Sequence, residues 1–485
     1  MTVSIAEAQQ EQTIETDIPQ RLDRLPWSSW HMRILTALGT SWLLDGLEVT
    51  LVGSLAGILT SPHGLSLTDK QVTAAATTYL AGAVFGALLF GWLTDRLGRR
   101  KLFLVTVATY SLATLCSAFS WSFFSFALFR FVTGVGIGGE YAAINSAVDE
   151  LIPGRIRGTV DLIVNGTFWI GGTVGGLVAI YLLGGQHPAL GDHGWRYAFG
   201  VGGVLGVVIF LLRLSVPESP RWLMLRGREE QARAVVEQIE AAASHGDAGR
   251  LPKPEGESLK IAVRDHTPWK AIFGNMLGEN RIRSVLGLVL MVAQAFFFNA
   301  IFFSYGLVAK TFFQVSDSDI PKRLLPFAIA SFLGPVTIGR LFDTVGRKKM
   351  IAITYGLAGL LLAGTAIPFA TGSLGMRGVG IGFTLIFFIA SSAASAAYLT
   401  VSEIFPLELR AFAIAVFYAL GTLAGGVGAP VLFGALIETH SRLPVALGYG
   451  LGAVLMFGAA ICEIAFGVEA AGRSLESVSK PLQSR

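Results

Sequence analysis

The 485-residue chain has little charge and almost no cysteine. Asp, Glu, Lys and Arg make up 14% of its residues, against roughly 25% in soluble domains, whereas 52% are hydrophobic. The two cysteines, Cys116 and Cys462, both lie in apolar runs and give no sign of a disulfide framework. The composition therefore indicates a protein solvated by lipid and argues against a large soluble domain, and the 58 glycines fit closely packed membrane helices.

Motifs for catalysis and for nucleic-acid binding are missing as well. The sequence contains no phosphate-binding P-loop, and its seven histidines show no HExxH or comparable metal-ligand spacing. The net charge of +4 comes from bases that lie between apolar runs. We therefore predict no enzyme activity, no metal, no cofactor and no nucleic-acid partner. The polar, acidic N-terminus also lacks the form of a signal peptide.

Apolar runs long enough to span a bilayer, about 20 residues each, occur six times on either side of a polar stretch. The predicted spans are 32–59, 72–94, 102–120, 122–148, 159–184, 196–215, 284–312, 323–342, 349–370, 377–403, 411–437 and 443–467. This pattern predicts an all-α polytopic membrane protein with twelve transmembrane helices in two six-helix halves. The predicted segments are a tail (1–31), the first half (32–215), a loop with short helices (216–283), the second half (284–467) and a second tail (468–485).

Lysine and arginine concentrate in alternate loops, at 95–101, 149–158, 216–283 and 340–349. The positive-inside rule places such loops in the cytoplasm. We therefore expect a multi-pass protein of the cell membrane with both termini cytoplasmic. The apolar spacing of residues 228–243 predicts a short amphipathic helix in the long loop.

Two charged stretches are repeated in the two halves. GWLTDRLGRRKL (91–102) matches GRLFDTVGRKKM (339–350), and ELIPGRIR (150–157) matches EIFPLELR (403–410). Each copy falls at the predicted cytoplasmic end of its half, so we predict a gate whose ion pairs form when this side is shut. The alternative is that the bases only fix the topology. The predicted gate residues are Asp95, Arg99, Arg100, Glu150, Arg157, Asp343, Arg347, Glu403 and Arg410, with Glu150–Arg100 and Glu403–Arg347 as candidate pairs.

Four segments resemble the sugar-porter branch of the major facilitator superfamily: RFVTGVGIG (130–138), ELIPGRIRG (150–158), VPESPRWLMLRG (216–227) and SEIFPLELR (402–410). The same pieces occur in organic-ion, nicotinate and synaptic-vesicle glycoprotein-like transporters. The resemblance implies two halves that rock about a central site. It implies a secondary active transporter that moves a small organic solute by alternating access, with protons and the lipid bilayer as its other partners. We expect a monomer.

The sequence departs from sugar porters where substrate contacts are expected. The tenth span has Ser395 and Tyr398 in place of Pro and Trp, and the seventh has one glutamine in QAFFFN. Fewer amides and more aromatic rings favour an aromatic or heterocyclic organic ion over a hexose. LDGLEV in the first span resembles the Asp-Gly-x-Asp of aromatic-acid–proton symporters. By resemblance, the candidate substrate-binding residues are Asn165, Trp169, Gln294, Asn299, Tyr305 and Tyr398.

Ionisable residues inside spans are costly and usually line a cavity. Asp45 and Glu48 lie one turn apart in the first span, and Arg130 and Glu140 lie in the fourth. The resemblance implies that Glu48 and Arg130 form the proton-coupling pair. Asp45 is the second candidate, for protonation or for a cationic substrate, and Glu140 is either a structural group or a gate residue. A static salt bridge in a uniporter, a proton-antiport exporter and a transport-dead receptor or scaffold are the alternatives.

Overall fold

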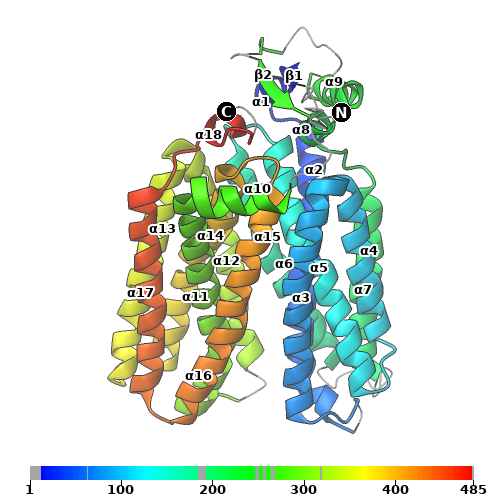
Figure 1. Ribbon diagram of the computed structural model, residues 1–485. Helices are drawn as coiled ribbons and strands as arrows, with labels where there is room; N and C mark the ends of the chain where they lie inside the picture. The colour runs from blue at the N-terminus through cyan, green and yellow to red at the C-terminus, as the bar shows by residue number, and fades with distance from the viewer. Residues whose placement is uncertain are drawn as a thin grey trace, which may run out of the picture.

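The structure, a computed structural model, describes residues 13–62, 64–183, 193–244, 246, 251–254, 258–263, 268–316 and 319–482. Within these ranges, twelve long helical spans form two bundles that lie side by side (Figure 1). The first bundle contains α2 (Ser29–Thr60), α3 (Asp69–Leu97), α4 (Arg99–Ser117), α5 (Phe123–Leu151), α6 (Arg157–Leu183) and α7 (Gly194–Arg213). The second contains α11 (Arg281–Phe313), α12 (Ile320–Thr344), α13 (Arg347–Ala370), α14 (Met376–Ile404), α15 (Arg410–Gly421) continued through the π-helical η4 (Thr422–Gly428) into α16 (Ala429–Glu438), and α17 (Arg442–Phe466). The predicted twelve-helix fold is confirmed.

Ten of these spans, among the described residues, are long and apolar enough to cross a membrane. The other two are α4 and α5, which carry several charged residues. Helix α4 begins with three bases, and α5 holds Arg130, Glu140, Asp149 and Glu150, all buried inside the protein. Since these side chains are sheltered from lipid, α5 can span the bilayer despite its charges.

Glycine lets the helices of the first bundle approach closely. A Cβ atom on Gly134 or Gly138 of α5 would clash with backbone carbonyl oxygens of α3, and one on Gly46 of α2 would clash with the carbonyl oxygen of Phe168 in α6. Such small-residue contacts are typical of membrane helix packing. They hold α5 against α3 and α6 against α2, and so fix the charged side chains that these helices carry.

A small terminal cap covers one end of both bundles (Figure 1). It consists of the described residues of 13–25, 216–263 and 468–482, with α1 (Ile18–Asp23), α8 (Pro220–Leu225), α9 (Glu229–Ala243) and α18 (Leu475–Val478). In it, β1 (Thr13–Thr16) pairs antiparallel with β2 (Leu259–Ala262), an element that the sequence did not predict. Helix α9 corresponds to the amphipathic helix predicted for residues 228–243. After the cap, α10 (Trp269–Gly274) and η3 (Asn275–Glu279) lead into the second bundle.

The two bundles meet near the terminal cap and diverge toward the opposite end (Figure 1). We call the end that carries the cap the cap end. Both described chain ends and the turns that carry the repeated stretches lie there. The cap end is therefore the predicted cytoplasmic side.

Candidate functional site

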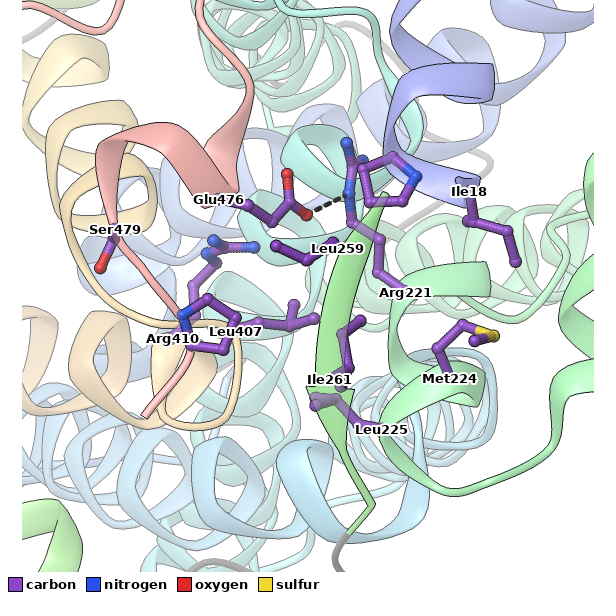
Figure 2. Close-up of a pocket in the computed structure, with 12 residues that line it drawn as sticks. Ile18, Arg221, Met224, Leu225, Leu259, Ile261, Leu407, Arg410, Glu476 and Ser479 are labelled. Atoms are coloured by element: carbon purple, nitrogen blue, oxygen red, sulfur yellow. Dashed lines mark hydrogen bonds and ion pairs between the residues drawn. The ribbon is translucent and has the colours of Figure 1, made fainter. Parts of the chain in front are cut away.

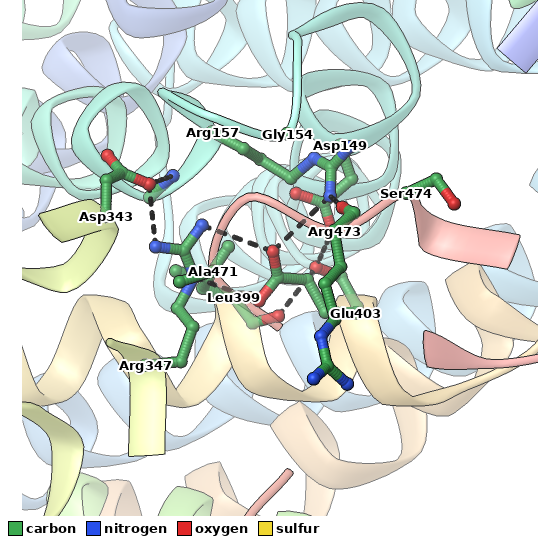
Figure 3. Close-up of polar contacts among 12 residues, drawn as sticks. Asp149, Gly154, Arg157, Asp343, Arg347, Leu399, Glu403, Ala471, Arg473 and Ser474 are labelled. Carbon is green, nitrogen blue, oxygen red and sulfur yellow. Dashed lines mark hydrogen bonds and ion pairs between the residues drawn. The ribbon is translucent and has the colours of Figure 1, made fainter. Parts of the chain in front are cut away.

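The second copy of the repeated motifs forms a buried ion-pair network at the cap end (Figure 3). Gly346, with φ of 117°, turns the chain into α13 and directs Arg347 inward. Arg347 pairs with Asp343 at 2.7 Å and with Glu403 at 3.1 Å. Glu403 also lies 3.5 Å from Arg157 of the first bundle, so the network joins the two bundles. The predicted Glu403–Arg347 pair is present.

The first copy forms the equivalent network. Gly98, with φ of 97°, precedes α4 and directs Arg99 inward. Arg99 lies 2.9 Å from Glu150 and 3.2 Å from Asp95. Arg410 of the second bundle approaches Glu150 to 3.8 Å. Each bundle therefore sends one arginine toward the buried glutamate of the other.

The predicted Glu150–Arg100 pair is wrong. Glu150 pairs with Arg99, whereas the exposed Arg100 donates a hydrogen bond to the carbonyl oxygen of Leu214 at 3.2 Å. Successive residues of a helix point about 100° apart. Arg99 faces the bundle interior, so Arg100 must face away from it.

Both repeated aspartates bind the start of a helix in the opposite bundle. Asp343 accepts hydrogen bonds from the amides of Gly158 and Thr159, at 3.1 and 2.7 Å, at the N-terminus of α6. Asp95 accepts one from the amide of Phe412, at 3.1 Å, at the N-terminus of α15. Free backbone amides and the helix dipole stabilise a carboxylate at such a position. These reciprocal contacts were not visible in the sequence, because they join residues from different bundles.

Ion pairs also attach the terminal cap to the bundles and hold it together. Arg21 and Arg24 of the N-terminal tail each lie 2.6 Å from Glu240 of α9. Arg221 of α8 lies 2.9 Å from Glu476 of α18 (Figure 2). Burial alone would raise the pKa of Glu476, but the nearby Arg221 guanidinium brings it below its ordinary value. Both chain tails are thus tied to the central segment by charge.

The cap reaches the gate through Asp23, which lies 3.6 Å from Arg157 and 3.7 Å from Arg221. A small pocket, lined by Ile18, Met224 and other mainly apolar side chains, lies at this cap (Figure 2). The predicted substrate residues belong to the long helices and do not line it. Because Leu407 and the predicted gate residue Arg410 also line it, the pocket lies between the cap and the second bundle, and it is not the predicted substrate site.

Inside the first bundle, the structure brings Glu48 and Arg130 together. Arg130 donates to Glu48 at 2.5 Å, to Ser117 at 2.9 Å and to Thr133 at 3.1 Å. The second oxygen of Glu48 accepts from Thr114 at 2.9 Å. The whole group is buried. The pair that the resemblance implied exists, and its role in coupling stays a prediction.

Asp45 has a different environment, made of tyrosines. It accepts hydrogen bonds from Tyr79, at 3.3 Å, and from Tyr141. The ring of Tyr141 stacks on two tyrosines of the second bundle. Its centroid lies 4.3 Å from that of Tyr418 and 6.0 Å from that of Tyr398. Asp45 is therefore linked to the second bundle through one tyrosine. The sequence analysis missed Tyr79, Tyr141 and Tyr418, although tyrosines inside apolar spans usually need a polar partner.

Glu140, the residue before Tyr141, forms an ion pair with Arg213 of α7. Arg213 in turn donates to Ser41 of α2. These contacts tie three helices of the first bundle together. They agree with the structural interpretation of Glu140.

The predicted substrate residues do not form one cluster. Trp169 packs against Phe298 and Phe387 of the second bundle, with ring centroids 5.7 and 5.8 Å apart. Gln294 is buried, and its amide lies 3.9 Å from a methionine sulfur, which is a weak partner. Tyr305 instead packs on Phe327 inside the second bundle.

The other predicted amides bond mainly to protein groups. Asn299 donates to the carbonyl oxygen of Ala295 in its own helix at 2.7 Å. Asn165 bonds to Asn145 and to the backbone of Asp161. Among the described residues, Trp169 and Tyr398 are the members of the predicted set that contact rings across the bundle interface.

Two similar six-helix bundles joined by reciprocal ion-pair motifs define a major-facilitator membrane transporter. Residues 32–481 match the model of the sugar (and other) transporter family, so the chain belongs to this family. It is 26% identical over 465 residues to the niacin transporter NiaP of Acinetobacter baylyi, covering 95% of this chain and 99% of the relative. It is also 26% identical over 471 residues to the gallate transporter of Pseudomonas putida, covering 96% and 98%.

Solved structures confirm the fold. The proton:xylose symporter XylE bound to 6-bromo-6-deoxy-D-glucose superposes with a TM-score of 0.75 at 20% identity, covering 93% of this chain and 98% of that one. The inward-open form of XylE from E. coli superposes with a TM-score of 0.58. The protein is thus a multi-pass membrane transporter and not an enzyme.

Proposed function

We propose that the protein is a proton-coupled importer that moves a small organic solute by alternating access. The observation that carries the proposal is the buried Glu48–Arg130 ion pair, which lies inside the spanning part of the first bundle. A charge pair at this depth is costly to bury and is commonly retained for function. Protonation of Glu48 would weaken its hold on Arg130 and let the helices around the pair rearrange.

The contacts at the cap end support alternation between a form that is shut at this end and a form that is open there. At the cap end, Asp95 and Asp343 each bind the start of a helix of the opposite bundle. These contacts stabilise the form that is shut at the cap end, because they are lost when the bundles part there. A ligand or proton that prefers the other form would shift the balance by its differential affinity.

We further propose that the substrate is an aromatic or heterocyclic organic acid, bound between the bundles near Trp169. Its ring contacts with Phe298 and Phe387 show that aromatic surfaces of both bundles meet there. A flat ring can stack between such surfaces. Relatives named for niacin and for gallate, both aromatic-ring acids, support this class.

The test is uptake by purified full-length protein in lipid vesicles. Under an imposed pH gradient, we expect accumulation of niacin or gallate and none of xylose or glucose. Glu48→Gln should still exchange labelled substrate across the vesicle membrane but should lose accumulation driven by the gradient. If Glu48→Gln accumulates substrate as the parent does, coupling lies elsewhere and Asp45 is the next residue to test. Uptake of a sugar alone would contradict the substrate class.

A further inference from the structure

Two buried aspartates at the bundle interface have no arginine partner. Asp149 in α5 and Asp161 in α6 are both fully buried, and among the described residues neither forms an ion pair. Asp149 accepts a hydrogen bond from Ser402 of the second bundle through one oxygen only. Within the described part of the chain, neither carboxyl oxygen of Asp161 has a hydrogen-bond donor.

The side-chain oxygen of Asn165, next to Asp161, is a second buried polar group without a partner in the described part of the chain. Asn165 lies one turn further along α6, on the same face. Both hydrogens of its NH2 group are used, toward the backbone oxygen of Asp161 at 2.8 Å and toward Asn145 at 3.1 Å. Its side-chain oxygen is buried and has no donor. Turning the amide over would supply Asp161 with a donor but would lose both bonds.

Protonation of Asp161 would remove its unfavourable buried charge. Ionised Asp161 would be a buried charge with no donor, which is strongly unfavourable. Protonated Asp161 carries an O–H donor, and the buried side-chain oxygen of Asn165, one turn along the same helix, is an acceptor without a partner among the described residues. One proton would therefore satisfy two buried polar groups at once.

The surrounding charges do not offer an alternative. Asp161 faces Asp149, Glu403 and Arg347, and Asp149 faces Arg157 and Arg410 as well. Arg347 is already paired with Asp343 and Glu403. Two further carboxylates near Asp161 disfavour a negative charge there.

We propose that Asp161, with Asp149 beside it, is a proton-binding site of the gate, loaded while the bundles are shut at the cap end and emptied into water when that end opens. The inference rests on the proposed alternating access. Since the shut form then binds more protons than the open form, acid favours the shut form, and rising pH favours opening. This site is separate from the Glu48–Arg130 pair, which lies inside the first bundle only.

The test measures gate opening against pH in full-length protein in lipid nanodiscs. Spin labels would replace the exposed Lys101 and Lys349, equivalent residues of the repeat in the two bundles, after both native cysteines are changed to serine. Between about pH 5 and about pH 9, the open fraction of the parent should rise with pH, by up to about tenfold per unit for one proton. Asp161→Asn cannot ionise, and its NH2 can donate to Asn165, so it should stay shut with a flatter response.

Asp343→Asn is the matched control at the same interface. Its carboxylate is paired with Arg347 and with the start of α6, so its neutralisation should open the gate at every pH. An Asp161→Asn gate that opens as Asp343→Asn does, or that keeps the full pH response of the parent, overturns the proposal.

Infrared difference spectra give a direct second measurement. The carbonyl band of a neutral carboxylic acid, present in the shut parent, should be reduced in Asp161→Asn. In Asp343→Asn at neutral pH it should fall together with gate opening, because Asp161 then faces water. An unchanged band in Asp161→Asn would show that Asp161 is ionised and would overturn the proposal. If Asp161→Asn does not fold, Asn165→Ala removes the amide next to Asp161 and should shift the pH at which the gate opens, and an unshifted response would also overturn the proposal. Glu48→Gln separates the coupling proposal from the gate proposal. It should lose gradient-driven uptake while its gate still opens as pH rises.

Discussion

Replacing Arg130 by methionine should destabilise the protein by about 3–5 kcal/mol, the typical loss when one partner of a buried ion pair is removed. Arg130 donates hydrogen bonds to Glu48 at 2.5 Å and to Ser117 and Thr133 at 2.9 and 3.1 Å. Methionine fills a similar volume but donates none of them. The largest part of the loss comes from Glu48, which keeps only its bond from Thr114 and stays buried.

A double-mutant cycle separates this charge effect from lost packing. Glu48→Gln removes the other charge, and the double variant Glu48→Gln/Arg130→Met removes both. Because the double variant leaves no unpaired charge, its loss should be smaller than the sum of the two single losses, by about 0.5–3 kcal/mol. The measurement is reversible unfolding of the purified protein in mixed micelles. A loss below about 1 kcal/mol for Arg130→Met, or strictly additive losses, would refute the reasoning.

Three further predictions concern the gate, the cap and the orientation. Arg347→Ala should slow transport more than it weakens substrate binding, and unchanged vesicle uptake would leave its loop a topology signal only. Burial acts to raise the pKa of Glu240, but hydrogen bonds from Arg21 and Arg24 bring this pKa below its ordinary value. Cap stability from this carboxylate is therefore lost as pH falls through that lowered value. Hydrogen-exchange protection of residues 13–25, taken relative to the intrinsic exchange rate at each pH, should fall in acid in the parent, whereas in Glu240→Gln it should be low at every pH. A thiol reagent added outside cells should label His440→Cys but not Glu237→Cys, and the reverse would invert the topology.

The repeated motifs made much of the gate predictable. Two copies of one pattern require two similar surroundings, so Glu403 and Arg347 could be matched before any coordinates were known. The partner of Glu150 could not be chosen in the same way, because Arg99 and Arg100 are adjacent bases and only the helix direction at Gly98 decides which one faces inward.

Contacts between bundles were less accessible to sequence reasoning. The position of Asp343 at the start of α6 depends on how two separate bundles dock. The tyrosines around Asp45 come from different helices, and β1 pairs with a strand more than 240 residues away (Thr13 with Ala262). Hydrophobic periodicity reports which residues share one face of a helix, but it carries no information on which other helix covers that face.

The two kinds of buried carboxyl group in the gate would respond to charge in opposite ways. Asp343 holds the shut form through its negative charge, because Arg347 and two helix-start amides stabilise only the ionised group. The carboxyl oxygens of Asp161 find no hydrogen-bond donor among the described residues, so in our proposal Asp161 holds the shut form only while it is neutral. Loss of charge at Asp343 and gain of charge at Asp161 would therefore both open the cap end. Such a gate combines a permanently ionised contact at Asp343 with a group, Asp161, whose protonation depends on the pH of the compartment into which the gate opens.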